Sequence, residues 1–457
     1  MNKPTAMRIA ALIVCGSVIG WSADQAIDIS YKAAADRLID AALADNGAYE
    51  KLSYLCDRIG NRISSSENYK KAAKWAAAEM ERDGLVNVST PEVMVPHWIR
   101  GREHAEIVSP VKRSLPMLGL GGSVGTPMDG ITAPLVIFTN FDELERAGRS
   151  KIDGKIVLFN VAYSGYGATV RYRAEGPSRA ARLGARAVLV RSVTPVSLQT
   201  PHTGALRYTD GIAKIPAAAI TIEDSLLLAR LVASGEKVSV KLDMEAHQEP
   251  DVTAVNVVGE LKGREKPEEV VVIGGHLDSW DVGQGAQDDG SGVVTAMQAV
   301  ALIHKLGLKP RRTIRVVLWT DEEYGSTGSL AYRKWIGPAI RNHVAAIEMD
   351  GGAEKPLGFG VAGDGPLQRV KPIGKLLERI GAGAITIGGG GADIAPLMKD
   401  GVPGIAHRSV GTRYFEWHHT QADTIDKIKP EELRLNVAAM AVMAYVIADM
   451  PERLDGK

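Results

Sequence analysis

Short runs of continuous apolar residues alternate with longer helical patterns from residue 251 to about 450. Strands that are apolar on both faces are typical of parallel sheets covered by helices on either side. The sequence therefore predicts an α/β fold with a mixed, largely parallel sheet and helices on both faces. The expected strands and helices are 270–273, 313–320 and 344–349 (strands), and 292–306 and 326–336 (helices).

The first half of the chain has a different character. Residues 27 to about 95 are predicted to be helical, with one helix from Ser66 to Arg82 that ends at Gly84. From about 105 to 245, short β-rich runs surround a small helix at 178–183. We expect this stretch to be an inserted β-rich domain. The expected organisation is a leader at 1–23, a main domain from 27–104 and 246–457, and an insertion at 105–245.

The N-terminus resembles an export signal. Lys3 and Arg8 precede an apolar run at 9–19, and small residues follow it. The run is too short to span a bilayer, and no other segment is long enough. We expect a periplasmic or extracellular protein, with lipid attachment at Cys15 as an alternative. Without the leader Cys56 is alone, which excludes a disulfide within the chain and favours a buried apolar role.

The charge balance argues against some partners. Lys and Arg together number 54, as do Asp and Glu, so the formal net charge is zero. A neutral chain offers no general attraction to nucleic acid or to an anionic surface. The glycine run at 388–391 is not followed by a dinucleotide or phosphate-loop pattern, so we expect no nucleotide site.

The densest chemistry follows the apolar run at 270–273. His276 and several carboxylates lie within the next residues, and His276, Glu322, Glu323 and Asp350 all lie just past the ends of predicted strands. Open α/β sheets place their sites at the carboxyl ends of strands. Imidazole with carboxylate is a ligand set for divalent cations, zinc first. The pattern predicts a site for two metals with a carboxylate left over as a base.

Several motifs carry a family resemblance. The chain resembles the carboxypeptidase Q family of co-catalytic dizinc exopeptidases, and the resemblance covers most of the sequence, the insertion included. It implies a zinc aminopeptidase-like fold with an inserted domain of the protease-associated type. The matching segments are GNRISSS at 60–66, PHW at 96–98, TPHTG at 200–204, GHLDSWDVGQGAQDDG at 275–290, WTDEEYG at 319–325, HHTQADT at 418–424 and IADM at 447–450.

The resemblance implies a ligand set for two zinc ions per chain. Asp288 is implied as the bridging carboxylate. His276 and Asp350 would complete one site, and Glu323 and His419 the other. The resemblance also implies a cis peptide bond between Asp288 and Asp289. Three protein ligands per metal leave a position open for water and substrate.

Other residues near these ligands receive supporting roles. Glu322 precedes a ligand and is the expected general base. Asp278 is expected to orient the imidazole of His276. Asp423 has two open interpretations, as the partner of the His419 imidazole or as part of a turn. His418 is interpreted as a neighbour packed beside the ligand; His202 is expected to be a core histidine, with an approach to substrate as the alternative.

The resulting hypothesis is an exported dizinc exopeptidase for short peptides. The resemblance implies dipeptides with free termini as substrates and a homodimer as the assembly. An aminopeptidase for longer peptides is the first alternative, because an open cleft would admit them. A non-catalytic relative is the second alternative, and the retained ligands with Glu322 argue against it.

Overall fold

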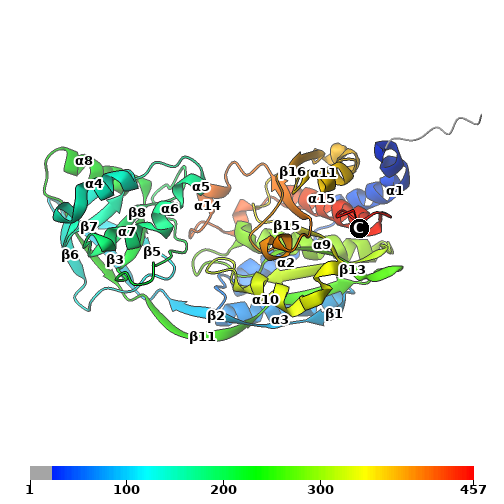
Figure 1. Ribbon diagram of the computed structural model, residues 1–457, viewed down its shortest axis with the longest axis horizontal. Coiled ribbons are helices and arrows are strands. Elements are labelled where there is room, and N and C mark those ends of the chain that lie inside the picture. Colours follow the sequence, from blue (N-terminus) through cyan, green and yellow to red (C-terminus); the bar gives the residue numbers. More distant parts are fainter. Residues whose placement is uncertain (1–22, 457) are drawn as a thin grey trace, which may run out of the picture.

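The computed structural model describes residues 23–456, so the leader and Cys15 lie outside the described residues. Figure 1 shows two lobes side by side, with the cyan and green insertion on the left and the remaining chain on the right. A long two-stranded ribbon joins the lobes. Its strands are β2 (Glu92–Ile99) and β11 (His247–Val255), which pair antiparallel.

The right-hand lobe is built on an eight-stranded mixed sheet. The central strands are parallel, and antiparallel pairs occur toward both edges. The fold class predicted from the sequence is therefore confirmed. In spatial order the strands are β1 (Val86–Ser89), β12 (Val257–Leu261), β14 (Arg312–Trp319), β13 (Lys266–His276), β15 (His343–Glu348), β18 (Gly404–Ser409), β16 (Pro356–Val361) and β17 (Ala384–Ile387).

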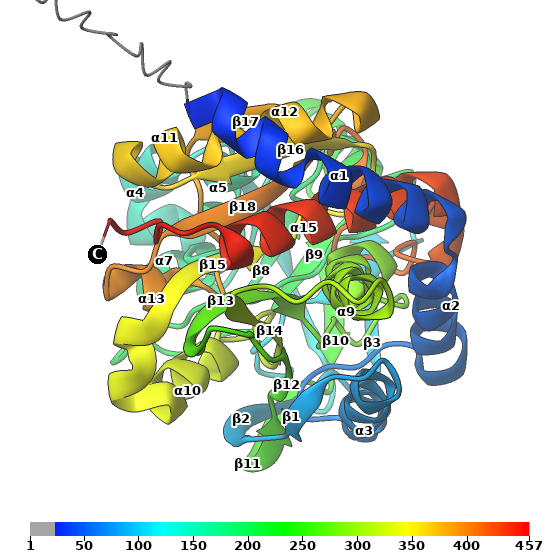
Figure 2. The ribbon, with the colours of Figure 1, turned by 90° about the vertical axis from the view of Figure 1, so that its right-hand side faces the viewer.

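Helices cover both faces of this sheet (Figure 2). Alternate residues of β13 show the division, because Val271 and Ile273 belong to one buried cluster while Val270 and Val272 belong to another. The larger cluster includes residues of α1 (Ala23–Ala44), α2 (Gly47–Tyr54), α3 (Glu67–Arg82), α9 (Ser291–Lys305), α12 (Ile373–Leu377) and α15 (Pro430–Asp449). The smaller includes residues of α10 (Thr327–Ile336) and α13 (Ala395–Lys399).

Short elements complete this lobe. Helix α11 lies beside α12 at the top of Figure 2. The π-helical turn η2 precedes α9, and α14 faces the insertion. Their bounds, with those of the remaining short turns, are α11 (Asp364–Val370), α14 (Tyr414–Trp417), η1 (Leu55–Ile59), η2 (Ala286–Gly290), η3 (Gly337–Asn342), η4 (Glu378–Ile380) and η5 (Ile425–Lys427).

The predicted helical start of the chain is only partly right. Helix α3 begins after Ser66, whose hydroxyl accepts a hydrogen bond from the Tyr69 amide, and it ends before Gly84 as expected. The segment beyond Gly84 is extended instead of helical. Strand β1 pairs with β12, and β2 enters the ribbon with β11. Pairing with distant strands supplies backbone hydrogen bonds that a window of neighbouring residues cannot reveal.

The left-hand lobe contains a second eight-stranded sheet, whose strands all lie between Glu103 and Met244. Four consecutive strands of this sheet are parallel, and the remaining neighbouring pairs are antiparallel. In spatial order they are β4 (Arg113–Leu115), β3 (Glu103–Ser109), β10 (Ser239–Met244), β6 (Ile131–Phe138), β7 (Ile156–Phe159), β8 (Ala187–Arg191), β9 (Ala217–Ile220) and β5 (Met117–Gly119).

This lobe has more helix than the sequence led us to expect. Only the small helix near 178–183 is anticipated; the two long helices α4 and α8 and the single turns α5 and α6 are additional. Strand β7 is buried along its whole length, so both faces of the sheet need a cover. Asn140 and Thr221 cap the two additional helices through their side chains. The helices are α4 (Phe141–Ile152), α5 (Tyr166–Thr169), α6 (Arg171–Ala174), α7 (Gly176–Arg182) and α8 (Ile222–Ala233).

Within residues 23–456, no helix combines the length and the apolar character needed to cross a bilayer.

Cys56 is buried within the main core, and burial raises the pKa of its thiol to about 12. This location agrees with the apolar role expected for it.

Candidate metal centre

Loops that follow the sheet strands bring the predicted site residues together. His276 is the last residue of β13, Glu322 and Glu323 lie in the turn after β14, and Asp350 follows β15. Asp288 belongs to the turn η2. The carboxyl ends of parallel strands meet at one edge of a sheet, which explains why residues far apart in sequence converge there.

His276, Asp288 and Asp350 form the first cluster. The Nε2 atom of His276 lies 3.1 Å from Asp288 Oδ1 and 3.8 Å from Asp350 Oδ1. One potential ligand atom from each of the three side chains lies within 4.8 Å of the others. His276 is fully buried, whereas the Asp350 side chain is 25% exposed. The cluster therefore opens to solvent on the Asp350 side.

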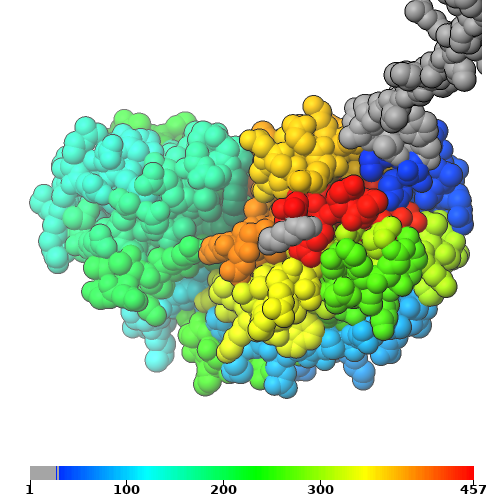
Figure 3. Space-filling view, turned by 45° about the vertical axis from the view of Figure 1, so that its right-hand side comes forward, coloured from blue at the N-terminus to red at the C-terminus, as the bar shows by residue number. Residues whose placement is uncertain are grey.

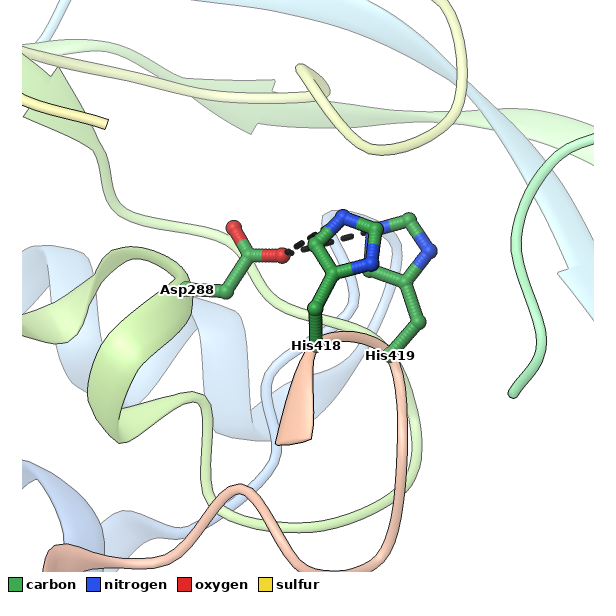
Figure 4. Close-up of side chains that lie close together, drawn as sticks. All are labelled: Asp288, His418 and His419. Carbon is green, nitrogen blue, oxygen red and sulfur yellow. Dashed lines mark ion pairs between the residues drawn. The ribbon is translucent and has the colours of Figure 1, made fainter. Parts of the chain in front are cut away.

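His419, Asp288 and Glu323 form the second cluster. The Nε2 atom of His419 lies 3.3 Å from Asp288 Oδ2 and 2.9 Å from Glu323 Oε2. His418 also approaches Asp288, at 3.5 Å, and Figure 4 shows both imidazoles facing this carboxylate. Only His419 is recorded in contact with Glu323 as well. Asp288 is thus shared by both clusters, one through each oxygen.

Hydrogen bonds to backbone oxygens orient both imidazoles. His276 Nδ1 lies 3.0 Å from the Asp278 carbonyl, and His419 Nδ1 lies 3.3 Å from the Thr203 carbonyl. A carbonyl accepts only, so each Nδ1 is the nitrogen that carries a proton. In the neutral imidazoles Nε2 then keeps its lone pair, and it faces carboxylates. That arrangement suits a cation placed between them.

Asp278 acts through its backbone and its side chain. Its carbonyl accepts the proton of His276, while its carboxylate accepts from the amides of Glu322 and Glu323 at 3.3 and 3.4 Å. The closest recorded distance from its carboxylate to His276 is 3.7 Å. Asp278 therefore links the histidine to the loop that presents both glutamates.

Asp423 contacts the Asp288 turn instead of an imidazole. Its two oxygens accept hydrogen bonds from the amides of Gln287, at 2.7 Å, and Asp288, at 3.1 Å. The structure favours the turn interpretation of this residue, because Nδ1 of His419 lies against Thr203 instead. The peptide bond between Asp288 and Asp289 is cis, as the resemblance implied.

The donor set fits zinc. Two imidazoles with the carboxylates of Asp288, Glu323 and Asp350 supply the nitrogen and oxygen ligands that Zn²⁺ prefers. Asp288 Oδ2 is buried and accepts no hydrogen bond from any of the described residues. A buried carboxylate oxygen without a donor is costly, and a metal ion at this point would satisfy it.

The carboxylates in this centre raise one another's pKa values. Burial raises the pKa of Glu322 well above its ordinary value, and the nearby charges of Asp350, Glu323 and Asp288 raise it further, against an opposing effect of His276. Burial and Asp288 raise the pKa of Glu323 to about 7. Bound cations would lower these values by offsetting the repulsion between the carboxylates.

A cavity of about 570 Å³ opens onto these residues. One wall carries Asp288, Glu322, Glu323 and Asp350 from the sheet lobe. The opposite wall comes from the insertion and includes Tyr166, Glu175 and three arginines, Arg171, Arg173 and Arg207. Figure 3 shows the cyan and green lobe in contact with the rest of the molecule, and the cavity lies between the two.

Comparison with known proteins gives the site its context. Residues 256–444 match the model of Peptidase family M28. The chain is 42% identical to carboxypeptidase Q of Xenopus laevis, over 93% of this chain and 91% of the relative. It is 41% identical to carboxypeptidase Q of Homo sapiens, over 90% of this chain and 87% of the relative.

The chain belongs to the carboxypeptidase Q family. It is therefore a zinc metallopeptidase of the M28 class, as the sequence resemblance implied. A Peptidase M28 precursor from Shewanella amazonensis superimposes with a TM-score of 0.90 at 35% identity, covering 94% of this chain and 98% of that one. A zinc aminopeptidase from Bacillus subtilis shares the fold, with a TM-score of 0.68 at 22% identity over 90% of this chain and 97% of that one.

His418 and His202 are both buried. His418 stacks on His419 with ring centroids 3.5 Å apart, and it also lies within ligand distance of Asp288 and His419, so the neighbour role expected for it stays a prediction. His202 is buried and does not belong to the cavity wall. Burial, with the nearby charge of His419, lowers the pKa of His202 to about 3, so the ring is neutral. The core interpretation of His202 fits better than an approach to substrate.

Some residues that organise the centre were not identified from the sequence. Arg62 is fully buried, and its side chain donates hydrogen bonds to the carbonyls of Leu277 and Gly285. These hydrogen bonds hold the loop between the two clusters. The segment 60–66 matched a motif of the family, but no role for Arg62 could be predicted from it. Tyr166 and Arg173 lie in a stretch that lacks ligand-type residues, so no sequence signal connected them with the cavity.

Proposed function

We propose that this chain is an exported dizinc exopeptidase that hydrolyses short peptides, preferably dipeptides with free ends. One observation carries the proposal. Asp288 is shared by two histidine–carboxylate clusters, and a separate carboxylate, Glu322, opens onto the same cavity. A peptidase of this class needs a ligand set together with a free base, and the arrangement of these residues supports both roles.

The chemistry is divided among these residues. His276, Asp288 and Asp350 would hold one zinc ion, and His419, Asp288 and Glu323 the other. When bound, zinc supplies a Lewis acid for the peptide carbonyl and lowers the pKa of a water molecule. Glu322 accepts the proton that the attacking water gives up and donates it to the leaving amine. Asp278 holds the Glu322 loop in place through the amide hydrogen bonds.

We further propose that residues 105–245 form a domain that limits substrate length. Support comes from the cavity, since one wall consists of insertion residues, among them Tyr166 and Arg173. The Thr203 amide also donates to the His419 carbonyl at 3.0 Å, so the insertion touches the ligand loop. A long peptide would have to pass between the two lobes, whereas a dipeptide fits within the cavity.

A panel of peptides tests this function. Zinc-loaded enzyme is assayed with a dipeptide, its N-acetyl form and a tetrapeptide. We expect rapid cleavage of the dipeptide and at least tenfold lower kcat/KM for the other two. Equal cleavage of the tetrapeptide would indicate an aminopeptidase for longer peptides and would remove the length limit. Failure to cleave every peptide would leave a non-catalytic relative as the better description.

Metal content is a separate test. Because one carboxylate bridges two ligand sets, zinc-equilibrated protein should contain close to two zinc ions per chain by elemental analysis. Full activity at one zinc ion per chain would contradict the bridged arrangement. Export and a homodimeric assembly remain proposals; N-terminal sequencing of secreted protein and light scattering of purified protein test them.

A further inference from the structure

Asp321 is the first of three consecutive acidic residues after β14, and it is neither a proposed ligand nor the proposed base. The residue is fully buried, and its φ of 62° lies in the left-handed region that residues other than glycine rarely adopt. Such a conformation persists only where the surrounding structure holds it. The contacts that hold Asp321 therefore show what the neighbouring Glu322 depends on.

Both carboxylate oxygens of Asp321 accept hydrogen bonds from hydroxyl groups of other segments. The Ser64 hydroxyl donates to Oδ1 at 2.9 Å, and the Thr327 hydroxyl donates to Oδ2. Ser64 is buried and lies 257 residues away in the sequence, whereas Thr327 is the first residue of α10. The Asp321 side chain thus ties the turn after β14 to the N-terminal part of the chain and to the helix that follows.

The Asp321 carbonyl closes the same turn from within. It accepts hydrogen bonds from the amides of Gly325, at 3.2 Å, and Ser326. Ser326 also has a positive φ, 58°, so the chain passes from β14 to α10 through two left-handed residues. Between them the Glu322 amide donates to the Asp278 carboxylate at 3.3 Å. The backbone on either side of Glu322 is therefore fixed by specific contacts.

The carboxylate of Glu322 has no comparable support of its own. Glu323 pairs with His419, but within residues 23–456 no hydrogen bond is made to the Glu322 carboxylate, which lines the cavity. A side chain without partners takes its direction from the backbone that carries it. A displacement of about 1 Å in a catalytic group can lower the rate by about a hundredfold, so the geometry of this turn matters for the reaction.

We propose that Asp321 is a positioning residue for the general base. Held by Ser64 and Thr327, it fixes the left-handed turn that directs Glu322 into the cavity. The assignment rests on the proposed function and adds to it the residues that keep the base in place. It also gives the segment 60–66 a part in the reaction, since Ser64 reaches the base loop through this one carboxylate.

The test measures steady-state kinetics of the zinc-loaded enzyme on alanyl-alanine, together with zinc content. Asp321→Ala should lower kcat by about 10–100-fold and leave KM and zinc content near wild type. Asp321→Gly should behave alike, because it relieves the backbone but also removes the carboxylate. Asp321→Asn should lose less, since one oxygen still accepts from Ser64. Ser64→Ala removes a single donor and should lower kcat by about threefold or more.

A second comparison separates positioning from general support of the fold. In the Glu322→Gln background no base remains to be positioned, so adding Asp321→Ala should change the residual kcat by less than about threefold. Asn87→Ala is the matched control, because it alters another non-glycine residue with positive φ, 53°, outside the cavity wall. Its kcat/KM should equal that of wild type.

Defined results would overturn the inference. Asp321→Ala could lower kcat by the same factor with and without Glu322→Gln, Asp321→Gly could keep full activity, or zinc could be lost in proportion to kcat. If Asp321→Ala does not fold, Asp321→Asn and Ser64→Ala are combined with Glu322→Gln and judged by the same criterion. Full activity of Glu322→Gln alone would instead overturn the base assignment and the inference together, and a wild type that cleaves no peptide would overturn the proposed function itself.

Discussion

Asp288 can serve both clusters because its two oxygens face different histidines. Oδ1 lies near His276 and Oδ2 near His419, and the Asp423 carboxylate holds the backbone of this turn through two amide hydrogen bonds. Glu322 differs from its neighbour Glu323 in its contacts, because within residues 23–456 Glu323 pairs with a histidine and Glu322 does not. Adjacent glutamates can therefore be assigned different roles, and substitutions can separate them.

Glu322→Gln should lower kcat by about 10²–10⁴-fold and leave zinc content near wild type, because the amide keeps the size but cannot accept a proton. Steady-state kinetics and elemental analysis measure the two effects. Glu323→Ala is the matched comparison and should weaken zinc binding at one site. The opposite pattern in the two variants would mean that base and ligand are exchanged.

Asp423→Ala should weaken zinc binding by about 10–100-fold, although Asp423 is not a proposed ligand, because the Asp288 turn loses its acceptor. Competition with a chelator measures the change. Asp426→Ala provides the control, since that exposed carboxylate contacts its sequence neighbours Thr424 and Lys427. Equal effects in the two variants would rule out a specific role for Asp423.

At the scale of elements, the start of α9 packs closely beneath the metal centre. A Cβ atom at Gly292 would lie 2.0 Å from the Met349 carbonyl oxygen and 2.5 Å from the Asp289 carboxylate. The Asp289 carboxylate also accepts the amide of His276 at 3.2 Å, so β13, β15 and α9 meet at this point. The glycine permits the close approach that brings His276 and Asp288 to the same centre.

Gly292→Ala should therefore destabilise the protein by about 3 kcal/mol or more, because backbone atoms cannot move aside as a side chain could. Chemical denaturation followed by circular dichroism measures the change. Gly365→Ala in α11 is the control, where the new methyl group has room and the helix gains propensity. That variant should be neutral or slightly more stable, and a comparable loss in it would show that the Gly292 contact is not the cause.

At the scale of the whole molecule, several neutral histidines are part of the interior. Burial lowers the pKa of both His343 and His407 to about 4. His343 is hydrogen-bonded to Tyr332 and Ala339, whereas neither ring nitrogen of His407 has a partner among the described residues. The unfolded chain takes up these protons near the ordinary pKa of about 6.5. Folding stability from these residues is therefore complete above pH 6.5 and is lost as the pH falls toward 4.

His407→Leu should reduce this acid sensitivity. Between pH 7 and pH 4.5 the free energy of unfolding of the variant should rise relative to wild type, by about 2–3 kcal/mol, because one pKa unit corresponds to about 1.4 kcal/mol. Denaturant titrations at both pH values give the difference. If the free energies of unfolding of variant and wild type differ by the same amount at both pH values, His407 does not take up a proton on unfolding.

The two lobes also divide the site between them. The sheet lobe provides the predicted ligands and base, and the insertion provides the opposite wall of the cavity and the acceptor for His419. Both sheets have helices against both faces, although the insertion was expected to be mainly β. The apolar runs at 156–159 and 187–190 could have predicted these helices, because strands that are apolar along their whole length need helices on both faces of the sheet.

The sequence by itself determined the parts that depend on local pattern and on residue type. Three strands of the main sheet followed from the apolar runs at 270–273, 313–320 and 344–349, and His276, Glu322, Glu323 and Asp350 were identified by their positions after those strands. Asp288 and His419 were implied as ligands by the family resemblance alone. Tertiary structure decided what depends on distant neighbours: the strand at 86–89, the role of Asp423 and the acceptor for His419. Arg173 is a further case, since nothing in the sequence distinguishes this arginine, and only folding buries it in the wall of the cavity.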